Sequence, residues 1–153
     1  FMKFGMLLLA VFISSQASAN ILQECFKRTY SAAHLRANPS QIVKTIELDL
    51  LSYQDNEVQV VESSLSVETK RMIANRSYFM TTYGCNGTNE ETMKNLTCSD
   101  SGQTFRVVSR NAQSVTVRVT SPMVLAAIES DTLLTLNPGR SNGIFVLNKV
   151  SCN

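Results

Sequence analysis

Apolar and polar residues alternate along most of the chain from residue 41 onwards. Between residues 41 and 50, isoleucine and leucine recur on one face, while Thr45, Glu47 and Asp49 occupy the other. A period of two is typical of a β-strand with one buried face. The pattern therefore predicts a half-buried strand that begins near Gln41 and ends in a turn at 54–56.

The strand that follows this turn changes phase along its length. Val60 lies in one phase, whereas Leu65 and Val67 lie in the other. A strand keeps its side-chain alternation unless an extra residue is inserted. We therefore expect a bulge or a second turn between Val61 and Ser64.

Residues 105–109 and 115–119 form the clearest predicted hairpin. Burying Phe105 and the valines of both segments on one face fixes their register. Val107 must then lie opposite Val117, which leaves a connection of three residues between the strands.

Arginines occupy the outer face of this hairpin. In the predicted register, Arg106 lies directly opposite Arg118, and Arg110 follows further along. Like charges directly opposed across two strands destabilise the pair by roughly a few tenths of a kcal/mol. Either a neighbouring acid such as Glu47 or Asp49 balances this charge, or the face binds an acidic protein or a small anion. We therefore name the three arginines as candidate binding residues.

The remaining segments are short and are separated by polar turns. We expect one helix of one or two turns within 25–39, because this stretch is rich in alanine and ends at a proline. Residues 122–128 are compatible with a strand or with a turn of helix. Further strands are expected at 72–83, interrupted at Asn75-Arg76, at 133–136 and at 144–150. Together these segments predict an all-β domain, a single antiparallel β-barrel or sandwich of about seven or eight strands.

The segment 84–102 is expected to be a long loop closed by a disulfide. Cys85 and Cys98 lie near its two ends, and loops of this length tend to be functional or mobile. Tyr83 stands at the mouth of the loop. Because tyrosine often anchors protein interfaces, we name it as a fourth candidate contact residue, with ordinary strand packing as the alternative.

The chain has four cysteines, an even number that predicts two disulfides if the chain is exported, with three possible pairings. We favour Cys85–Cys98, which are close in sequence, and Cys25–Cys152 then joins the two ends of the domain. A metal site is not expected, because the chain has no Cys-x-x-Cys motif and a single histidine. We also expect no cofactor.

The first nineteen residues have the three parts of a secretory signal peptide. Lys3 supplies the positive charge, Phe4–Ile13 the apolar core and Ala17-Ser18-Ala19 the cleavage pattern. We therefore expect residues 20–153 to form a single disulfide-tied domain, periplasmic or secreted and without stable insertion in a membrane. The formal net charge of +2 gives no reason to expect nucleic acid as a partner.

Ser31 and His34 are the one pair that suggests catalysis. Residues three apart share one face of a helix, so the two side chains could form a hydrolase-type dyad. We find no third group and no oxyanion donor in the sequence. We therefore expect structural roles for both residues and no enzymatic activity.

The opening of the mature segment contains a set of spaced residues: Cys25, Arg28, Tyr30, His34, Leu35, Pro39, Gln41 and Val43. With these residues it resembles the opening of a group of small exported, periplasmic proteins of Gram-negative bacteria. The resemblance implies export and a disulfide-tied β-domain, and it carries no activity. The predicted overall shape also resembles that of the small periplasmic β-barrels that inhibit lysozyme.

The sequence therefore predicts an exported β-domain with a non-catalytic, binding or inhibitor-like role in the cell envelope. Two other classes remain open at this point. A hydrolase using Ser31 and His34 would lose activity when His34 is replaced. A structural component of the envelope would show an exposed strand edge together with self-association.

Overall fold

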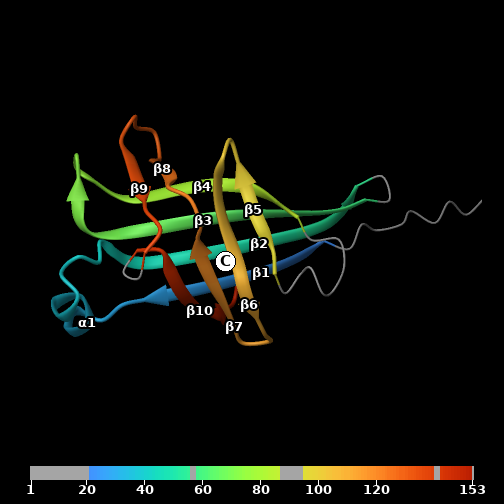
Figure 1. The fold of residues 1–153 in the computed structure, drawn as a ribbon, viewed down its shortest axis with the longest axis horizontal. Coiled ribbons are helices and arrows are strands. Elements are labelled where there is room, and N and C mark those ends of the chain that lie inside the picture. The colour runs from blue at the N-terminus through green and yellow to red at the C-terminus, as the bar shows by residue number, and fades with distance from the viewer. Residues whose placement is uncertain (1–20, 56–57, 87–94, 140–141, 153) are drawn as a thin grey trace, which may run out of the picture.

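The computed structural model describes residues 21–55, 58–86, 95–139 and 142–152 (Figure 1). The expected signal peptide lies outside these residues. Within them, strands dominate and there is one short helix. The elements are β1 (Leu22–Thr29), α1 (Ala32–Ala37), β2 (Val43–Asp55), β3 (Val58–Ile73), β4 (Arg76–Asn86), β5 (Thr97–Asp100), β6 (Gln103–Arg110), β7 (Ser114–Val119), β8 (Met123–Ala127), β9 (Leu133–Leu136) and β10 (Ile144–Val150).

Eight of the strands close into an antiparallel barrel. Their order around the barrel is β3-β2-β1-β10-β7-β6-β5-β4, and β4 pairs with β3 to complete the circle. Strands β8 and β9 extend from β4 outside this circle. The all-β prediction is confirmed, and of its two alternatives the chain forms the barrel.

Two pairs of strands lie on opposite sides of the barrel. On one side are the long strands β2 and β3, of 13 and 16 residues. On the other are β6 and β7, which cross in front of the long strands at a steep angle in Figure 1. Two strands separate these pairs in either direction around the circle: β4 and β5 one way, β1 and β10 the other.

Side chains fill the interior of the barrel. Most strands contribute buried leucine, valine or phenylalanine side chains, β5 contributes Cys98, and together these form one continuous core. Every buried side-chain nitrogen or oxygen among the described residues has a hydrogen-bond partner. The largest completely buried side chains are Phe26, Phe79, Phe105, Phe145, Ile46, Leu48, Leu65, Leu96, Met123, Leu125, Leu136 and Leu147.

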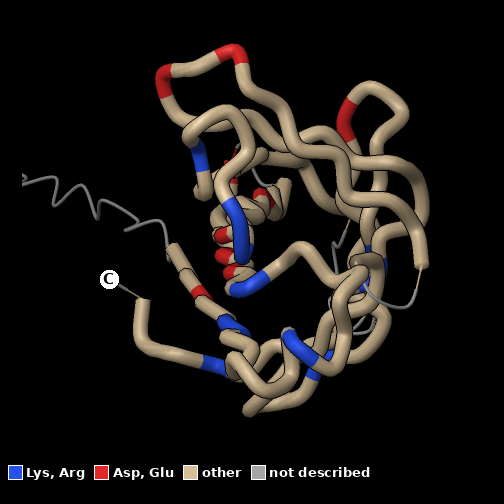
Figure 2. The backbone as a smooth tube through the Cα atoms, turned by 90° about the vertical axis from the view of Figure 1, so that its left-hand side faces the viewer, with Lys and Arg blue, Asp and Glu red and all other residues tan. Residues whose placement is uncertain are grey.

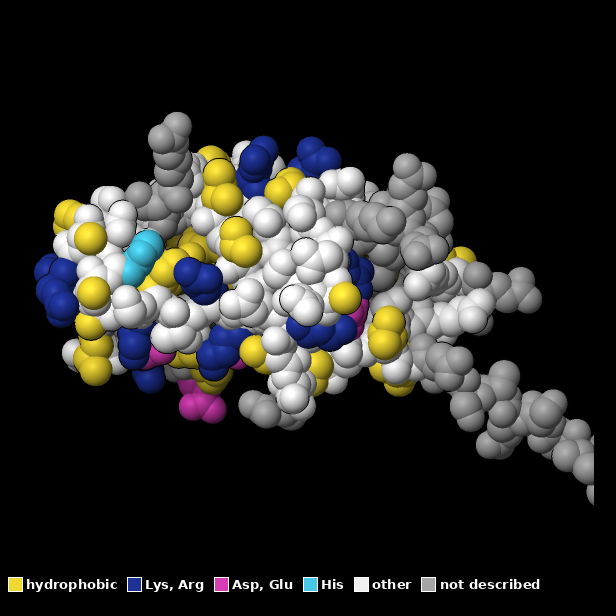
Figure 3. Space-filling view, turned by 90° about the horizontal axis from the view of Figure 1, so that it is seen from below, with side chains coloured by type: hydrophobic (Ala, Val, Ile, Leu, Met, Phe, Trp, Pro, Cys, Tyr) yellow, Lys and Arg dark blue, Asp and Glu magenta, His cyan; other side chains and the backbone are white. Residues whose placement is uncertain are grey.

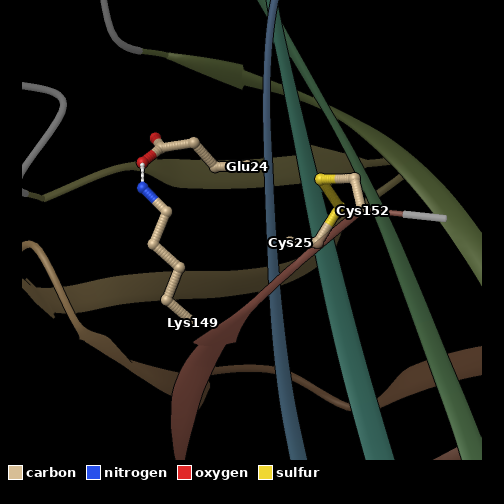
Figure 4. The surroundings of a disulfide bond; sticks show 4 residues. All are labelled: Glu24, Cys25, Lys149 and Cys152. Carbon is tan, nitrogen blue, oxygen red and sulfur yellow. Dashed lines mark hydrogen bonds and ion pairs between the residues drawn. A yellow bond between two sulfur atoms is a disulfide. The ribbon is translucent and has the colours of Figure 1, made fainter.

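Both expected disulfides are present. Cys25 of β1 is bonded to Cys152, which follows β10, and the two residues are 127 positions apart in sequence (Figure 4). Cys85 is bonded to Cys98, thirteen positions away. Such bonds are typical of proteins that fold in an oxidising compartment. No helix among the described residues is long and apolar enough to cross a membrane.

Strand β3 runs without the break expected between Val61 and Ser64, and that prediction is wrong. Its register with β2 is regular through this stretch. Val61 points into the core, whereas Val60 does not. Ser63 takes the next inward position, where its hydroxyl donates to the carbonyl oxygen of Tyr83 at 3.2 Å. The inward and outward alternation of side chains along β3 is therefore uninterrupted, because the buried Ser63 continues its inward face.

The segment 84–102 is not a single long loop, as the sequence suggested. Strand β4 continues to Asn86, and β5 pairs with both β4 and β6. Ser101 and Gly102 form the tight turn between β5 and β6, both with positive φ, as two-residue hairpin turns commonly require. The disulfide thus joins two residues that face each other across paired strands, and only residues 87–94 lie outside the described structure.

The stretch 25–39 divides into strand and helix. Residues up to Thr29 belong to β1, and only α1 is helical, which confirms a helix of one or two turns. Residues 74 and 75 form the turn that separates β3 from β4, one residue before the interruption expected at Asn75-Arg76. The ambiguous segment at 122–128 contains a strand, β8.

Candidate functional site

The two opposed arginines are where the sequence placed them. Phe105 pairs with Val119 and Val107 with Val117 inside the barrel, so the residues between them face outwards. Arg106 therefore lies directly opposite Arg118 on the outer surface, and both side chains are exposed. We call these two residues the arginine pair.

The neighbours of the arginine pair do not neutralise it. On β10, Ile144 lies opposite Arg118, and on β5, Thr97 lies opposite Arg106. Among the described residues, no carboxylate forms an ion pair with either arginine. On the face shown in Figure 3, basic side chains are prominent and acidic ones sparse.

The expected local acids lie elsewhere. Glu47 and Asp49 are on β2, which is not adjacent to β6 or β7 in the barrel. The carboxylate of Glu47 instead forms an ion pair with Lys27 of β1, at 2.5 Å. The prediction that either acid balances the arginine pair is therefore wrong, because the order of strands around a barrel is not visible in the sequence.

Arg110 does not belong to this outer face, contrary to expectation. The register between β6 and β7 shifts between Val107 and Ser109, so that Arg110 lies opposite the buried Val115. A bulge of this kind reverses the side-chain phase of the strand beyond it. The side chain of Arg110 is 13% exposed, and its guanidinium forms an ion pair with Glu24 of β1.

The carboxylate of Glu24 also forms an ion pair with Lys149 of β10, whose ammonium lies 2.9 Å from the second carboxylate oxygen (Figure 4). One acid from β1 thus holds two cations from β6 and β10 close to the Cys25–Cys152 disulfide. Burial lowers the pKa of Arg110. This cluster ties three strands together, and its role is structural.

Tyr83 is part of the core. Its side chain is 4% exposed and its ring packs against Phe105 edge to face, with 5.7 Å between the ring centres. Its hydroxyl donates to Gln103 at 3.1 Å, and burial raises its pKa. The alternative of ordinary strand packing therefore holds, and the ring is not available to a partner at the surface.

Ser31 and His34 have structural contacts. The Ser31 hydroxyl oxygen accepts a hydrogen bond from the backbone N–H of His34, which caps the start of α1. The imidazole stacks on Tyr30 with ring centres 4.8 Å apart, and its Nε2 lies 3.0 Å from the side-chain oxygen of Gln41. The two side chains thus have separate partners, and the residues join α1 to the end of the barrel.

A hollow on the opposite side of the barrel was missed by the sequence reasoning. It has a volume of about 550 Å³ and lies over the outward positions of β1 to β4. Asp49 and Glu62 supply its carboxylates, and the two lie diagonally across the β2–β3 pair. We call this hollow the acidic groove. Its other outward-facing side chains are Gln23, Leu51, Ser64 and Thr82.

The acids of the groove differ from their neighbours along the same strands. Glu47 and Glu68 form ion pairs with Lys27 and Lys44. Among the described residues, Asp49 forms no ion pair, and burial together with the negative charge of Glu47 raises its pKa. Figure 2, which looks along the long strands, shows acidic positions stacked in its left half.

Replacing Asp49 with asparagine should stabilise the protein at neutral pH. Because the folded state raises the pKa of this carboxyl, its ionised form opposes folding, and the neutral amide removes that cost. The gain should be largest near pH 7 and should disappear as the pH falls below about 4, where Asp49 is protonated in both states. Urea unfolding of both proteins across this pH range measures the difference in their free energies of unfolding. A stabilisation that grows towards acidic pH would contradict a raised pKa of Asp49 in the folded state.

No protein family, no curated protein and no solved structure matches this chain. The arginine pair and the acidic groove are therefore interpreted from their own geometry and charge.

Proposed function

We propose that this chain is an exported binding protein, periplasmic or secreted, with a non-catalytic and inhibitor-like role in the cell envelope. Its contact surface is the arginine pair, and its partner presents carboxylates or another anionic group. Two disulfides and a barrel interior filled with side chains support a rigid domain that binds with its outer surface.

The single observation behind this proposal is the position of the arginine pair. Arg106 and Arg118 face each other on the outside of the barrel, and no acid among the described residues pairs with them. Their mutual repulsion is a cost in the isolated protein. A carboxylate placed between them removes the repulsion and receives the two-pronged hydrogen bonding that guanidinium groups provide.

The arginine side-chain signals in NMR spectra test the proposal directly. Hexaglutamate added at low salt should shift the Nε–Hε signals of Arg106 and Arg118. Arg71 and Arg76, which are exposed on either side of the turn between β3 and β4, serve as internal controls. Since the expected attraction is between exposed charges, added salt should reverse the shifts. Equal shifts at all four residues would show that the peptide binds by net charge alone and would refute the proposed site.

A further inference from the structure

The arginine pair and the acidic groove face in opposite directions. The pair lies on β6 and β7, and the groove lies chiefly over β2 and β3, half-way around the same closed barrel. Two like charges that form no ion pair with any described residue are thus placed on one side of the molecule, and the groove on the other side holds carboxylates of the opposite sign.

Both surfaces lack an opposite charge from within the described part of the chain. Asp49 and Glu62 form no ion pair there, and the hydroxyl of Tyr53 donates to the Glu62 carboxylate at 3.0 Å. By contrast, Glu47 and Glu68, on the same two strands, are each paired with a lysine. The groove therefore offers carboxylate oxygens to a cationic group that comes from outside the chain.

The surroundings of the two charged sites are also complementary. Beside the arginine pair, Ile144 and Val146 of β10 are 40% and 50% exposed. The groove contains Leu51 and small side chains such as Ser64, which leave room above the sheet. An incoming surface could thus cover aliphatic side chains while its arginines enter the hollow.

We propose that the arginine pair of one copy of this protein docks into the acidic groove of a second copy. This rests on the proposed function, in which the arginine pair is a contact surface, and it names the partner. The guanidinium groups of Arg106 and Arg118 meet the carboxylates of Asp49 and Glu62. Because the two surfaces differ and point in opposite directions, the association is head to tail and continues as an open chain of molecules.

Analytical ultracentrifugation of the oxidised protein, purified after export, tests this arrangement. At low salt, the weight-average mass should rise at least twofold from micromolar to millimolar protein. It should return to that of the monomer at an ionic strength of about 1 M, where charges are screened beyond about 3 Å. The double variant Arg71→Ser/Arg76→Ser has the same net charge as Arg106→Ser/Arg118→Ser, and it should still associate.

Two further double variants separate the two surfaces. Arg106→Ser/Arg118→Ser removes the cationic surface, and Asp49→Asn/Glu62→Gln removes the acidic one, so each protein alone should remain monomeric. Their equimolar mixture retains one intact surface of each kind. The mixture should therefore form dimers and stop at that size, whereas the unchanged protein continues to grow.

Three results would overturn the inference: a monomeric unchanged protein at millimolar concentration, association of either double variant alone, or a mixture that stays monomeric. Thermal melting of both double variants checks that they are folded. If the unchanged protein stays monomeric while hexaglutamate still shifts Arg106 and Arg118, the proposed function stands and only the partner is wrong. If the peptide has no effect on these signals, the proposed function itself fails.

Discussion

Replacing Cys25 and Cys152 together with alanine should lower the free energy of unfolding by about 5 kcal/mol. This disulfide joins residues 127 positions apart. In the chain-entropy account, a cross-link of that span removes many conformations from the unfolded state. It also holds the end of β10 against β1, which are neighbours in the barrel. Urea unfolding of the oxidised proteins measures the loss.

The second disulfide provides the matched control. Cys85 and Cys98 are only thirteen positions apart and already face each other across paired strands. Its removal should cost about 3 kcal/mol on the same account. A larger loss for Cys85→Ala/Cys98→Ala than for the long-range bond would show that the span of the closed loop does not govern stability here.

Replacing Glu24 with glutamine should cost roughly 3 kcal/mol of folding free energy. The change removes the carboxylate that holds Arg110, whose side chain is 13% exposed, while the cation stays in a poorly solvated place. It also removes the partner of Lys149. Removing the carboxylate partner of a poorly solvated cation is among the more destabilising changes that a single substitution causes.

Glu47→Gln is the control for this prediction. Its ion pair with Lys27 is solvent-exposed, with side chains 38% and 44% exposed. Exposed pairs contribute at most about 1 kcal/mol, so this variant should stay close to the unchanged protein in urea unfolding. Equal losses for Glu24→Gln and Glu47→Gln would contradict the distinction between a buried cluster and a surface pair.

The hairpin of β6 and β7 shows what the sequence could predict. Its alternating valines fixed the pairing of Val107 with Val117 and therefore the opposition of Arg106 and Arg118. The same alternation misplaced Arg110, because the bulge near Val108 has no glycine or other signal in the sequence. One inserted residue was enough to turn a predicted surface arginine into a member of a buried ion-pair cluster.

The acidic groove could not be predicted, because it depends on strand order. Asp49 was correctly placed on an outward face, but its assigned partners were on strands that lie across the barrel. Pairing between β2 and β3 brings Asp49 and Glu62 together, and the closure of β4 onto β3 shapes the hollow. Strand β5 was missed for a related reason: four residues of mixed polarity form a strand only because both neighbours pair with them.

Calorimetric titration with hexaglutamate, combined with urea unfolding of the same samples, tests most directly whether the arginine pair binds an anionic partner and is not needed for folding. For Arg106→Ser/Arg118→Ser, we expect an affinity loss of at least about tenfold, which corresponds to about 1.4 kcal/mol. We expect unfolding free energy to be unchanged or raised by roughly a few tenths of a kcal/mol, because the repulsion between the arginines is removed. Arg71→Ser/Arg76→Ser should bind like the unchanged protein. Retained affinity in the first variant, or a marked loss of its stability, would contradict the account.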